Sequence, residues 1–312
     1  MHSAAALRWS LIAAVAIMAV WGANFAITKY VLGVLGVGPF LFIRFLTMPL
    51  LGFALLAVVY RRHLRKSWPT RDDLPRFVAA GVIGHTLHVG IVTWGIDLST
   101  AFSSSLVLTS GPLFTLLILA ALGVEKLRAR QLAGTLVAFA GIVVFLSDKF
   151  VSGLARAGIG DLVLIFAASL FSLYTVTAKP LVARYGPLPV LAYTLLFGAP
   201  PLLAVTAPAF IAAPLAGLPP MVWLGMFWAA VISAFLGWLV WAWVNAVRGV
   251  ARSAPLMYLM PPISGVVAWL TLDETFTSLK IAGAVVTMAG VAWAQFGGGH
   301  PPPREAAQPD SG

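Results

Sequence analysis

Two histidines, His85 and His88, are the side chains in the apolar part of this chain that are best suited to chemistry. Their spacing of three residues places both imidazole rings on one face of a helix. A zinc site needs three or four protein ligands, and the one acid on the same segment, Asp97, lies nine residues beyond His88. We therefore predict neither a metal site nor a cofactor. Imidazole changes its charge near neutral pH, so the pair either carries protons or forms hydrogen bonds within a helix bundle, and we favour the second role.

Arg44 is the one permanent cation inside an apolar segment. A guanidinium group can bind a carboxylate through two parallel hydrogen bonds, which makes Arg44 a candidate contact for the carboxylate of a substrate. The same side chain is also suited to bracing its helix against backbone carbonyls, or to extending along apolar surface toward water. Both interpretations are open at this point.

Carboxylates are missing from the middle of every apolar segment. This absence disfavours a proton antiporter built on a deep Asp or Glu. Either a histidine carries protons, or the protein lets a solute run down its own gradient. We slightly favour the second alternative, in which the solute runs down its own gradient.

Polar and aromatic side chains at helical spacing predict the lining of a solute cavity. Trp21, Asn24 and Thr28 lie at positions i, i+3 and i+7, which share one helix face. The lining is rich in aromatic and hydroxyl groups and poor in charge, which suits a moderately apolar solute that is neutral or zwitterionic. The predicted lining residues are Trp21, Asn24, Thr28, His85, His88, Trp94, Ser105, Thr109, Tyr174, Thr177, Trp238, Trp241, Asn245 and Tyr258.

Each of these residues also has a structural interpretation. Serine and threonine in apolar helices are more often packing and interhelical hydrogen-bond residues than ligands. A tryptophan near a helix end, such as Trp94, is typical of an interfacial belt. For Asn24 we favour a structural hydrogen bond over a contact with solute.

Composition identifies the elements that must position these residues. The chain is 60% hydrophobic and only 10% charged, whereas soluble chains carry about 25% charge. An all-α integral membrane protein is therefore predicted. The first apolar run follows Arg8 without a convincing cleavage site, so we interpret it as a retained helix. Stretches of about 20 apolar residues predict ten spans, at 9–30, 38–60, 76–97, 101–123, 129–147, 160–179, 187–207, 221–246, 254–272 and 279–297.

The chain matches itself at an offset of 149 residues. This offset superposes four pairs: Pro112 on Pro261, Glu125 on Glu274, Gly134 on Gly283, and Gly141 on Gly290. We infer a duplication, with repeats at 9–150 and 151–297, an N-terminal segment at 1–8 and a polar, disordered tail at 298–312. The paired glycines predict small-residue seams where helices approach closely. Each paired glutamate is expected either to cap or to form a charge pair at the start of helix 129–147 or 279–297, where a carboxylate is favourable.

Loop charge predicts the orientation in the bilayer. With a cytoplasmic N-terminus, fifteen Lys and Arg residues fall in cytoplasmic segments and four on the opposite side. The positive-inside rule therefore predicts that both termini are cytoplasmic. Five helices per half is an odd number, so the two repeats have inverted topology, which is common among secondary transporters. Proline kinks helices, and we expect hinges for alternating access at Pro112, Pro255, Pro261 and Pro262.

Several short motifs carry a family resemblance. They include Trp21-Gly22-Ala23-Asn24-Phe25 in the first span, Gly123-Val124-Glu125-Lys126-Leu127 after the fourth, Gly160-Asp161 opening the sixth, and Leu272-Asp273-Glu274 before the tenth. In order and spacing the chain resembles the drug/metabolite transporter superfamily, specifically its EamA-type ten-helix exporters.

The resemblance implies a fold and a function class. It implies a basket-like fold of two five-helix repeats, with a central cavity lined mainly by helices 1, 3, 4, 6, 8 and 9. Members of the family move amino acids, other metabolites or drugs, usually outward, and exporters of amino acids, including aromatic ones, are the nearest guess. Because the family does not generally place helix 2 in the cavity, we favour a structural role for Arg44.

These observations predict a secondary transporter in a bacterial cytoplasmic (inner) membrane. Its partners are a small solute, best guessed as an amino acid or similar zwitterion, and the lipid bilayer; a drug or multidrug exporter is the alternative. The net charge of +10 is scattered over loops, so nucleic acid is not expected. No zinc motif, nucleophile elbow or pair of facing aspartates supports an intramembrane enzyme, and inverted repeats favour a carrier over a channel. The oligomeric state is open, and a monomer is compatible with the sequence.

Overall fold

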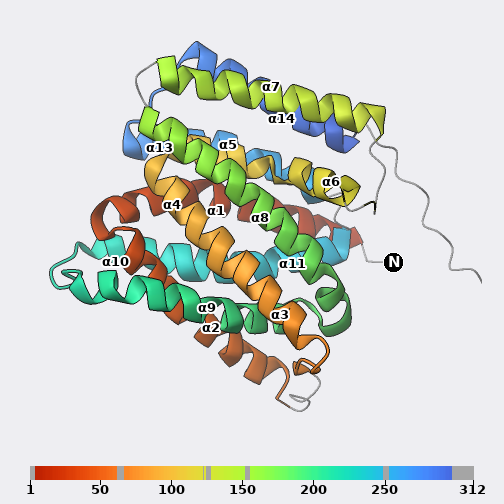
Figure 1. Cartoon of the computed structure of the whole chain (residues 1–312), viewed down its shortest axis with the longest axis vertical. Helices are drawn as coiled ribbons and strands as arrows, with labels where there is room; N and C mark the ends of the chain where they lie inside the picture. Colours follow the sequence, from red (N-terminus) through yellow and green to blue (C-terminus); the bar gives the residue numbers. More distant parts are fainter. Residues whose placement is uncertain are drawn as a thin grey trace, which may run out of the picture.

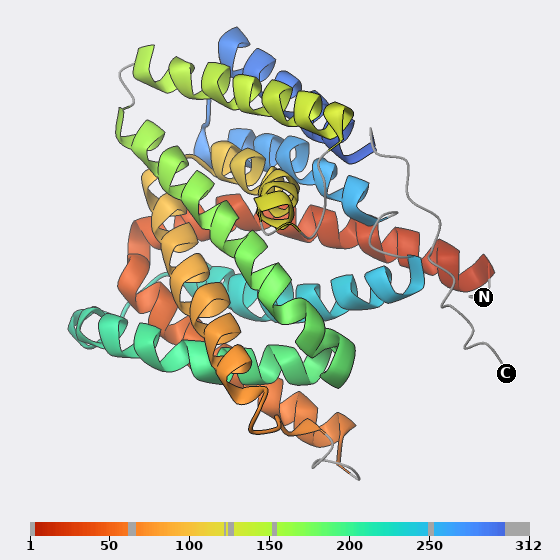
Figure 2. The ribbon, with the colours of Figure 1, turned by 45° about the vertical axis from the view of Figure 1, so that its right-hand side comes forward.

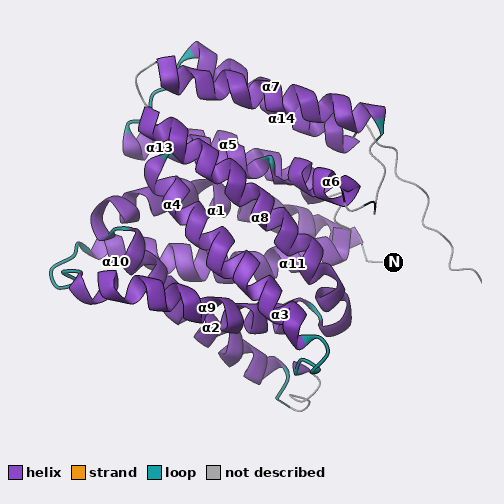
Figure 3. Ribbon diagram, in the orientation of Figure 1, coloured by secondary structure: helices purple, strands orange, loops and turns teal. Residues whose placement is uncertain are grey.

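The fold is described by a computed structural model, which covers residues 4–61, 67–121, 123, 128–151, 155–248 and 253–296. Every regular element in these ranges is a helix (Figure 3). A helix satisfies its backbone hydrogen bonds internally, which an apolar chain in a bilayer requires. Glu125 and the predicted tail at 298–312 lie outside the described residues.

Each of the ten predicted ranges overlaps one helix or a run of consecutive helices. In the part of the chain that is described, seven stretches are long and apolar enough to cross a membrane, and two more, at 256–272 and 278–294, are apolar but shorter. The elements are α1 (Ala4–Leu35), α2 (Val37–Val59), α3 (Leu74–Gly81), η2 (Val82–Val89), α4 (Gly90–Leu98), α5 (Ala101–Thr109), α6 (Gly111–Ala121), α7 (Ala129–Val151), α8 (Ala155–Tyr185), α9 (Pro187–Ala212), α10 (Pro220–Phe227), η3 (Trp228–Leu236), α11 (Gly237–Arg248), η4 (Ala254–Leu259), α13 (Met260–Leu272) and α14 (Ser278–Phe296).

Sharp turns separate α1 from α2 and α8 from α9 in the same way. Gly36 caps α2 with φ of 81°, and Gly186 caps α9 with φ of 82°. These left-handed conformations favour glycine because it has no Cβ. The two turns are 150 residues apart, close to the repeat offset seen in the sequence.

Two of the long helical stretches have a π-helical middle. The segment η2 separates α3 from α4, and η3 separates α10 from α11. Segments of this kind are rare and frequently mark functional sites. They occupy corresponding positions in the two halves, and no feature of the apolar pattern predicts them.

The predicted hinge prolines stand at helix starts. Pro112 is the second residue of α6, and Pro261 and Pro262 lie in the first turn of α13. Proline is tolerated there because the N–H it lacks would have no partner within the helix. Ser110 separates α5 from α6, and the 3-10 helix η4 passes directly into α13 at Met260. The side chains of Pro112 and Pro255 lie outside the described set, and a hinge role for these positions stays a prediction.

Helix α1 is central, and two helix pairs form the edges of the bundle. Figures 1 and 2 show α7 beside α14 at one edge, and α2 packs on α9 at the opposite edge. Between them, α4 packs on α8 as α11 packs on α1. Likewise α5 and α6 pack on α8 as α13 packs on α1. Contacts made by α1 therefore have counterparts made by α8.

The α7–α14 pair is joined at its glycines. A Cβ added to Gly134 would lie 2.3 Å from the backbone nitrogen of Ala294, and one added to Gly141 would lie 2.4 Å from that of Thr287. Only glycine permits backbones this close. The small-residue seam predicted from the paired glycines is confirmed.

Candidate functional site

Trp21 connects the central helix to the π-helical segment η3. Its indole Nε1 donates a hydrogen bond to the Ser233 carbonyl at 2.9 Å. Its ring also meets that of Trp241 edge-on, with 5.7 Å between centroids. This edge-to-face geometry is favourable for aromatic pairs, so two of the predicted lining residues are brought together.

Asn24 and Thr28 follow Trp21 on the same helix and leave polar atoms without partners. Thr28 is 1% exposed, and neither its Oγ1 nor the Asn24 Oδ1 has a hydrogen-bond partner among the described residues. Buried polar atoms are nearly always paired, so such exceptions need an explanation. The structural hydrogen bond that we favoured for Asn24 is not formed by its Oδ1.

The two histidines connect η2 to neighbouring helices. Thr194 donates its hydroxyl proton to the Val190 carbonyl at 2.7 Å, so His85 Nε2, 3.0 Å away, is the donor to Thr194. His88 Nδ1 donates to the Ala167 carbonyl at 2.8 Å. Hydrogen bonding within the bundle is therefore what both side chains do here, and proton transfer stays a prediction.

Aromatic rings from three elements, α2, α8 and α11, surround the histidines. Tyr174 lies 5.6 Å from His85 and 6.5 Å from Trp238, measured between ring centroids. Phe171 lies 5.1 Å from His88 and 5.9 Å from Trp238. We call the six residues Phe45, His85, His88, Phe171, Tyr174 and Trp238 the aromatic cluster; Phe45 joins it at 6.4 Å from His85.

Three residues in or next to the aromatic cluster were not predicted from the sequence. Phe171 stands three residues before Tyr174, on the same helix face, so its spacing could have identified it. Phe45 and Thr194 come from α2 and α9, which the family resemblance did not associate with the cavity.

Arg44 immediately precedes Phe45 and has no counter-ion among the described residues. Its Nε is buried without a partner, and no carboxylate of the described residues forms an ion pair with it. The guanidinium carbon lies 6.0 Å from the centre of the Phe40 ring, a contact of modest strength. A cation in apolar surroundings is costly unless a partner compensates it.

Other predicted lining residues satisfy their own helix or face outward. Ser105 donates to the Phe102 carbonyl and Thr109 to the Ser105 carbonyl, both at 2.7 Å. Thr177 likewise donates to the Leu173 carbonyl at 2.9 Å, and such bonds are a structural use of the hydroxyl. Trp94 is 51% exposed.

Tyr258 and Asn245 are the two remaining predicted lining residues. The Tyr258 hydroxyl is buried without a partner among the residues described. The side chain of Asn245 lies outside the described set.

Glu274 caps a different helix from the one expected. Its carboxylate accepts hydrogen bonds from the Ala101 and Phe102 backbone nitrogens, at 2.5 and 3.3 Å. The favourable position at a helix N-terminus is therefore that of α5, in the other half of the chain, and not that of α14. The expected cap on α14 was wrong because tertiary packing brings α5 to Glu274, whereas the charge of Glu274 does act on Lys280 in the first turn of α14.

Asp73 connects the start of α3 to the end of α8. Its Oδ2 accepts hydrogen bonds from the Tyr185 hydroxyl at 2.7 Å and from Arg184 at 2.6 Å. The Tyr185 hydrogen bond and the Arg184 charge hold the pKa of the Asp73 carboxyl below its usual value. This contact joins the two halves outside the apolar region.

Comparison with known proteins points to one class, membrane transporters. The profile of the EamA-like transporter family matches residues 8–147 and again residues 158–295. A protein of Streptantibioticus cattleyicolor named "probable terminal-alkyne amino-acid exporter" is 31% identical, covering 72% of this chain and 73% of its own. A "probable amino-acid metabolite efflux pump" of Escherichia coli is 24% identical, covering 91% and 94%. One solved crystal structure superposes with a TM-score of 0.60 at 18% identity, covering 92% of this chain and 97% of the other, which supports the fold alone.

Proposed function

The chain belongs to the EamA-like transporter family, and we propose that it exports a small amino-acid-like solute by alternating access between two inverted five-helix repeats. It is a multi-pass membrane transporter of the drug/metabolite transporter superfamily. The family and the named relatives are transporters rather than enzymes.

The unpaired cation of Arg44 carries this proposal. A solute carboxylate would supply the counter-ion that the described part of the protein does not, through the two-bond geometry that guanidinium favours. The adjoining aromatic cluster would then pack against the rest of the solute. A bracing role, favoured from the sequence, is less well supported because the Arg44 Nε meets no carbonyl.

The polar atoms left unpaired on α1 extend the proposed site. Thr28 Oγ1 and Asn24 Oδ1 are buried acceptors without donors in the described residues. An ammonium group offers three donors and no acceptor, so it would complement both. In this arrangement a zwitterion would lie between Arg44 and α1, with its side chain toward the aromatic cluster.

Several observations support the two-repeat architecture. One family profile matches the chain twice. Matched turns at Gly36 and Gly186, matched π-helical segments, and the equivalent contacts of α1 and α8 all fit two copies of one unit. Five spans in each copy would give the copies opposite orientations, which is the arrangement used in alternating access. We place both termini in the cytoplasm of a bacterium, from the loop charge.

A binding screen tests the substrate class. Purified protein would be heated with each of the common L-amino acids, and with the amide and the decarboxylated amine of each, because ligands stabilise the state they bind. We expect at least one amino acid to raise the melting temperature and its amide and amine to do so much less. No stabilisation by any carboxylate-bearing solute would contradict the proposal.

A transport assay then tests the role of the protein. Proteoliposomes loaded with the stabilising amino acid should take up its radiolabelled form by counterflow, saturably, whether or not a proton gradient is present. Uptake that requires the gradient would favour a proton-carrying histidine, and ohmic current would indicate a channel.

Drug export is the second candidate, favoured by the aromatic cluster. Rings from η2, α8 and α11 form an apolar surface suited to an uncharged organic solute. Stabilisation by neutral aromatic compounds that persists in Arg44→Gln would favour this candidate over an amino acid.

A further inference from the structure

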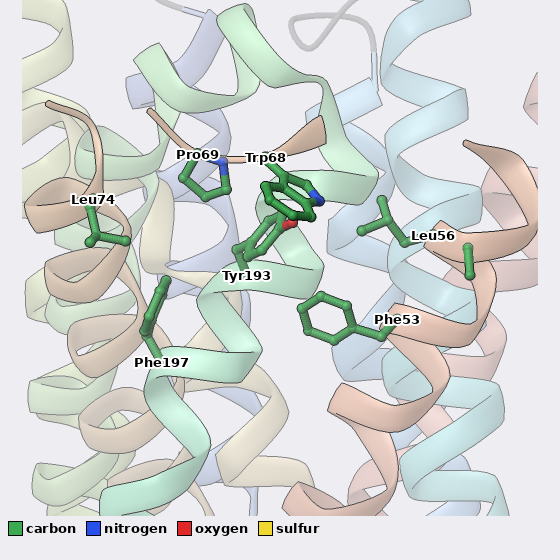
Figure 4. A pocket seen from close by; sticks show the side chains of 8 residues that line it. Phe53, Leu56, Trp68, Pro69, Leu74, Tyr193 and Phe197 are labelled. Carbon is green, nitrogen blue, oxygen red and sulfur yellow. The ribbon is translucent and has the colours of Figure 1, made fainter. Parts of the chain in front are cut away.

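A groove lies near the basic end of α2, separate from the aromatic cluster. It encloses about 590 Å³ between α2, the connection that precedes α3, α3 itself and α9 (Figure 4). This volume is in the range of small-molecule sites. None of its lining residues belongs to the aromatic cluster.

The walls of this groove are apolar and partly open to the outside. Phe53 and Tyr193 meet edge-on with 5.3 Å between their ring centroids, which fixes the floor between α2 and α9. Trp68 and Leu74 also line the groove and are 57% and 41% exposed. An exposed tryptophan at the end of an apolar helix is typical of the membrane interface. The groove is therefore open where lipid would be.

The rim of the groove is basic. Arg61 stands four residues after the lining residue Ala57, in the turn just beyond the end of α2. Arg71 lies between the lining residues Pro69 and Leu74, and both arginines are exposed.

The nearby acids do not cancel this charge. Asp73 is paired with Arg184, and Arg61, Arg71 and the neighbouring Arg76 then face one remaining acid, Asp72. Three arginines against one acid leave a net charge of +2 beside the apolar groove. A basic rim next to an apolar groove complements an anionic amphiphile.

We propose that this groove is a binding site for an anionic phospholipid, with an acyl chain between α2 and α9 and the headgroup phosphate at Arg61 and Arg71. Basic segments next to membrane helices attract anionic headgroups, while the aromatic walls exclude a polar amino-acid-like solute. The lipid holds α2, α3 and α9 together from outside the proposed transport site.

The test uses delipidated, detergent-purified full-length protein. Phosphatidylglycerol and phosphatidylcholine with the same oleoyl chains would be titrated separately while the melting temperature is measured. We expect phosphatidylglycerol to raise the melting temperature at lower concentration than phosphatidylcholine. In R61Q/R71Q this preference should fall by about fivefold per arginine removed. The matched control R8Q/R130Q removes two exposed cations elsewhere and should keep the preference.

Two groove variants test the acyl chain. Ala57→Trp fills the groove and should abolish the response of the melting temperature to both lipids. Trp68→Ala removes an exposed lining residue, leaves the core intact, and should weaken that response. Native mass spectrometry should find one phosphatidylglycerol retained by wild type and lost from R61Q/R71Q. Equal responses to the two lipids, an unchanged preference in R61Q/R71Q, an equal loss in R8Q/R130Q, or an unchanged response in both groove variants would each overturn the proposal.

Discussion

The α7–α14 pair and the proposed site differ in whether their buried polar groups have hydrogen-bond partners. In the pair, Thr135 donates to the Gln131 carbonyl and Thr287 to the Gly283 carbonyl, both at 2.8 Å, and glycines bring the backbones into contact. In the proposed site, on α1 and α2, Thr28 Oγ1 and Arg44 Nε are buried and have no partner in the described chain. One region is complete by itself, whereas the other lacks partners that a solute would supply.

This difference separates scaffold from site. Close packing, with the buried Thr135 and Thr287 hydroxyls bonded, fixes one arrangement of the two helices, because interiors are dense and do not deform continuously. The centre combines π-helical segments, helix interruptions and unpaired polar atoms, which are features that stability alone does not favour. We interpret them as features of a binding site.

The largest expected effect comes from filling the seam. In Gly141→Leu the new side chain would begin 2.4 Å from the Thr287 backbone nitrogen, so one helix must move. We expect a loss of about 3 kcal/mol or more, visible as little monodisperse protein on size-exclusion chromatography. Gly33→Leu is the control, because a Cβ there has nothing within 4 Å. Equal yields of the two variants would remove the distinction between the regions.

The next comparison replaces a hydroxyl with a methyl group in each region. Thr287→Val deletes a bonded hydroxyl and should cost about 1 kcal/mol of stability. Thr28→Val deletes an unbonded one and should leave stability unchanged or raise it by up to about 1 kcal/mol, while weakening solute binding about fivefold. Thermal unfolding and solute titration measure both effects. A larger loss of stability in Thr28→Val than in Thr287→Val would show that Thr28 is structural.

A smaller effect is expected at Asp73, outside both regions. Because its pKa is lowered by Tyr185 and Arg184, the carboxylate stabilises the fold at pH values above the unfolded pKa of about 4. That contribution is lost as pH falls through the lower pKa of the folded state. Wild type should therefore be more stable than Asp73→Asn at pH 7, and the gap between their melting temperatures should narrow below about pH 4. A gap independent of pH would contradict this account.

The sequence predicted the helices well and the site unevenly. The ranges 38–60 and 187–207 agree closely with α2 and α9 in where they begin, because apolar length and glycine turns are local signals. The π-helical segments were missed, since an extra residue in one helical turn leaves no mark on an almost uniformly apolar stretch. The cap made by Glu274 was assigned to the wrong helix because its partner Ala101, the first residue of α5, lies 173 residues away from it in the sequence.

Long-range packing also explains what was missed around Arg44. The residue type and position of Arg44 predicted a cation that is costly to bury. Only the folded chain reveals which partners it lacks, and that Phe45 and Thr194 belong to the same neighbourhood. Phe171 was recoverable from its spacing with Tyr174. Thr194 was not, because a threonine on α9 resembles any other packing residue.

The most direct test of the account is a cycle that pairs Arg44 with the solute carboxylate. Dissociation constants would be measured for the stabilising amino acid and its amide, with wild type and with Arg44→Gln, using Arg71→Gln as the control. We predict that the amide binds wild type at least tenfold more weakly than the acid, and that this ratio falls to near one in Arg44→Gln but persists in Arg71→Gln. An unchanged ratio in Arg44→Gln would contradict the claim that this buried cation receives the carboxylate.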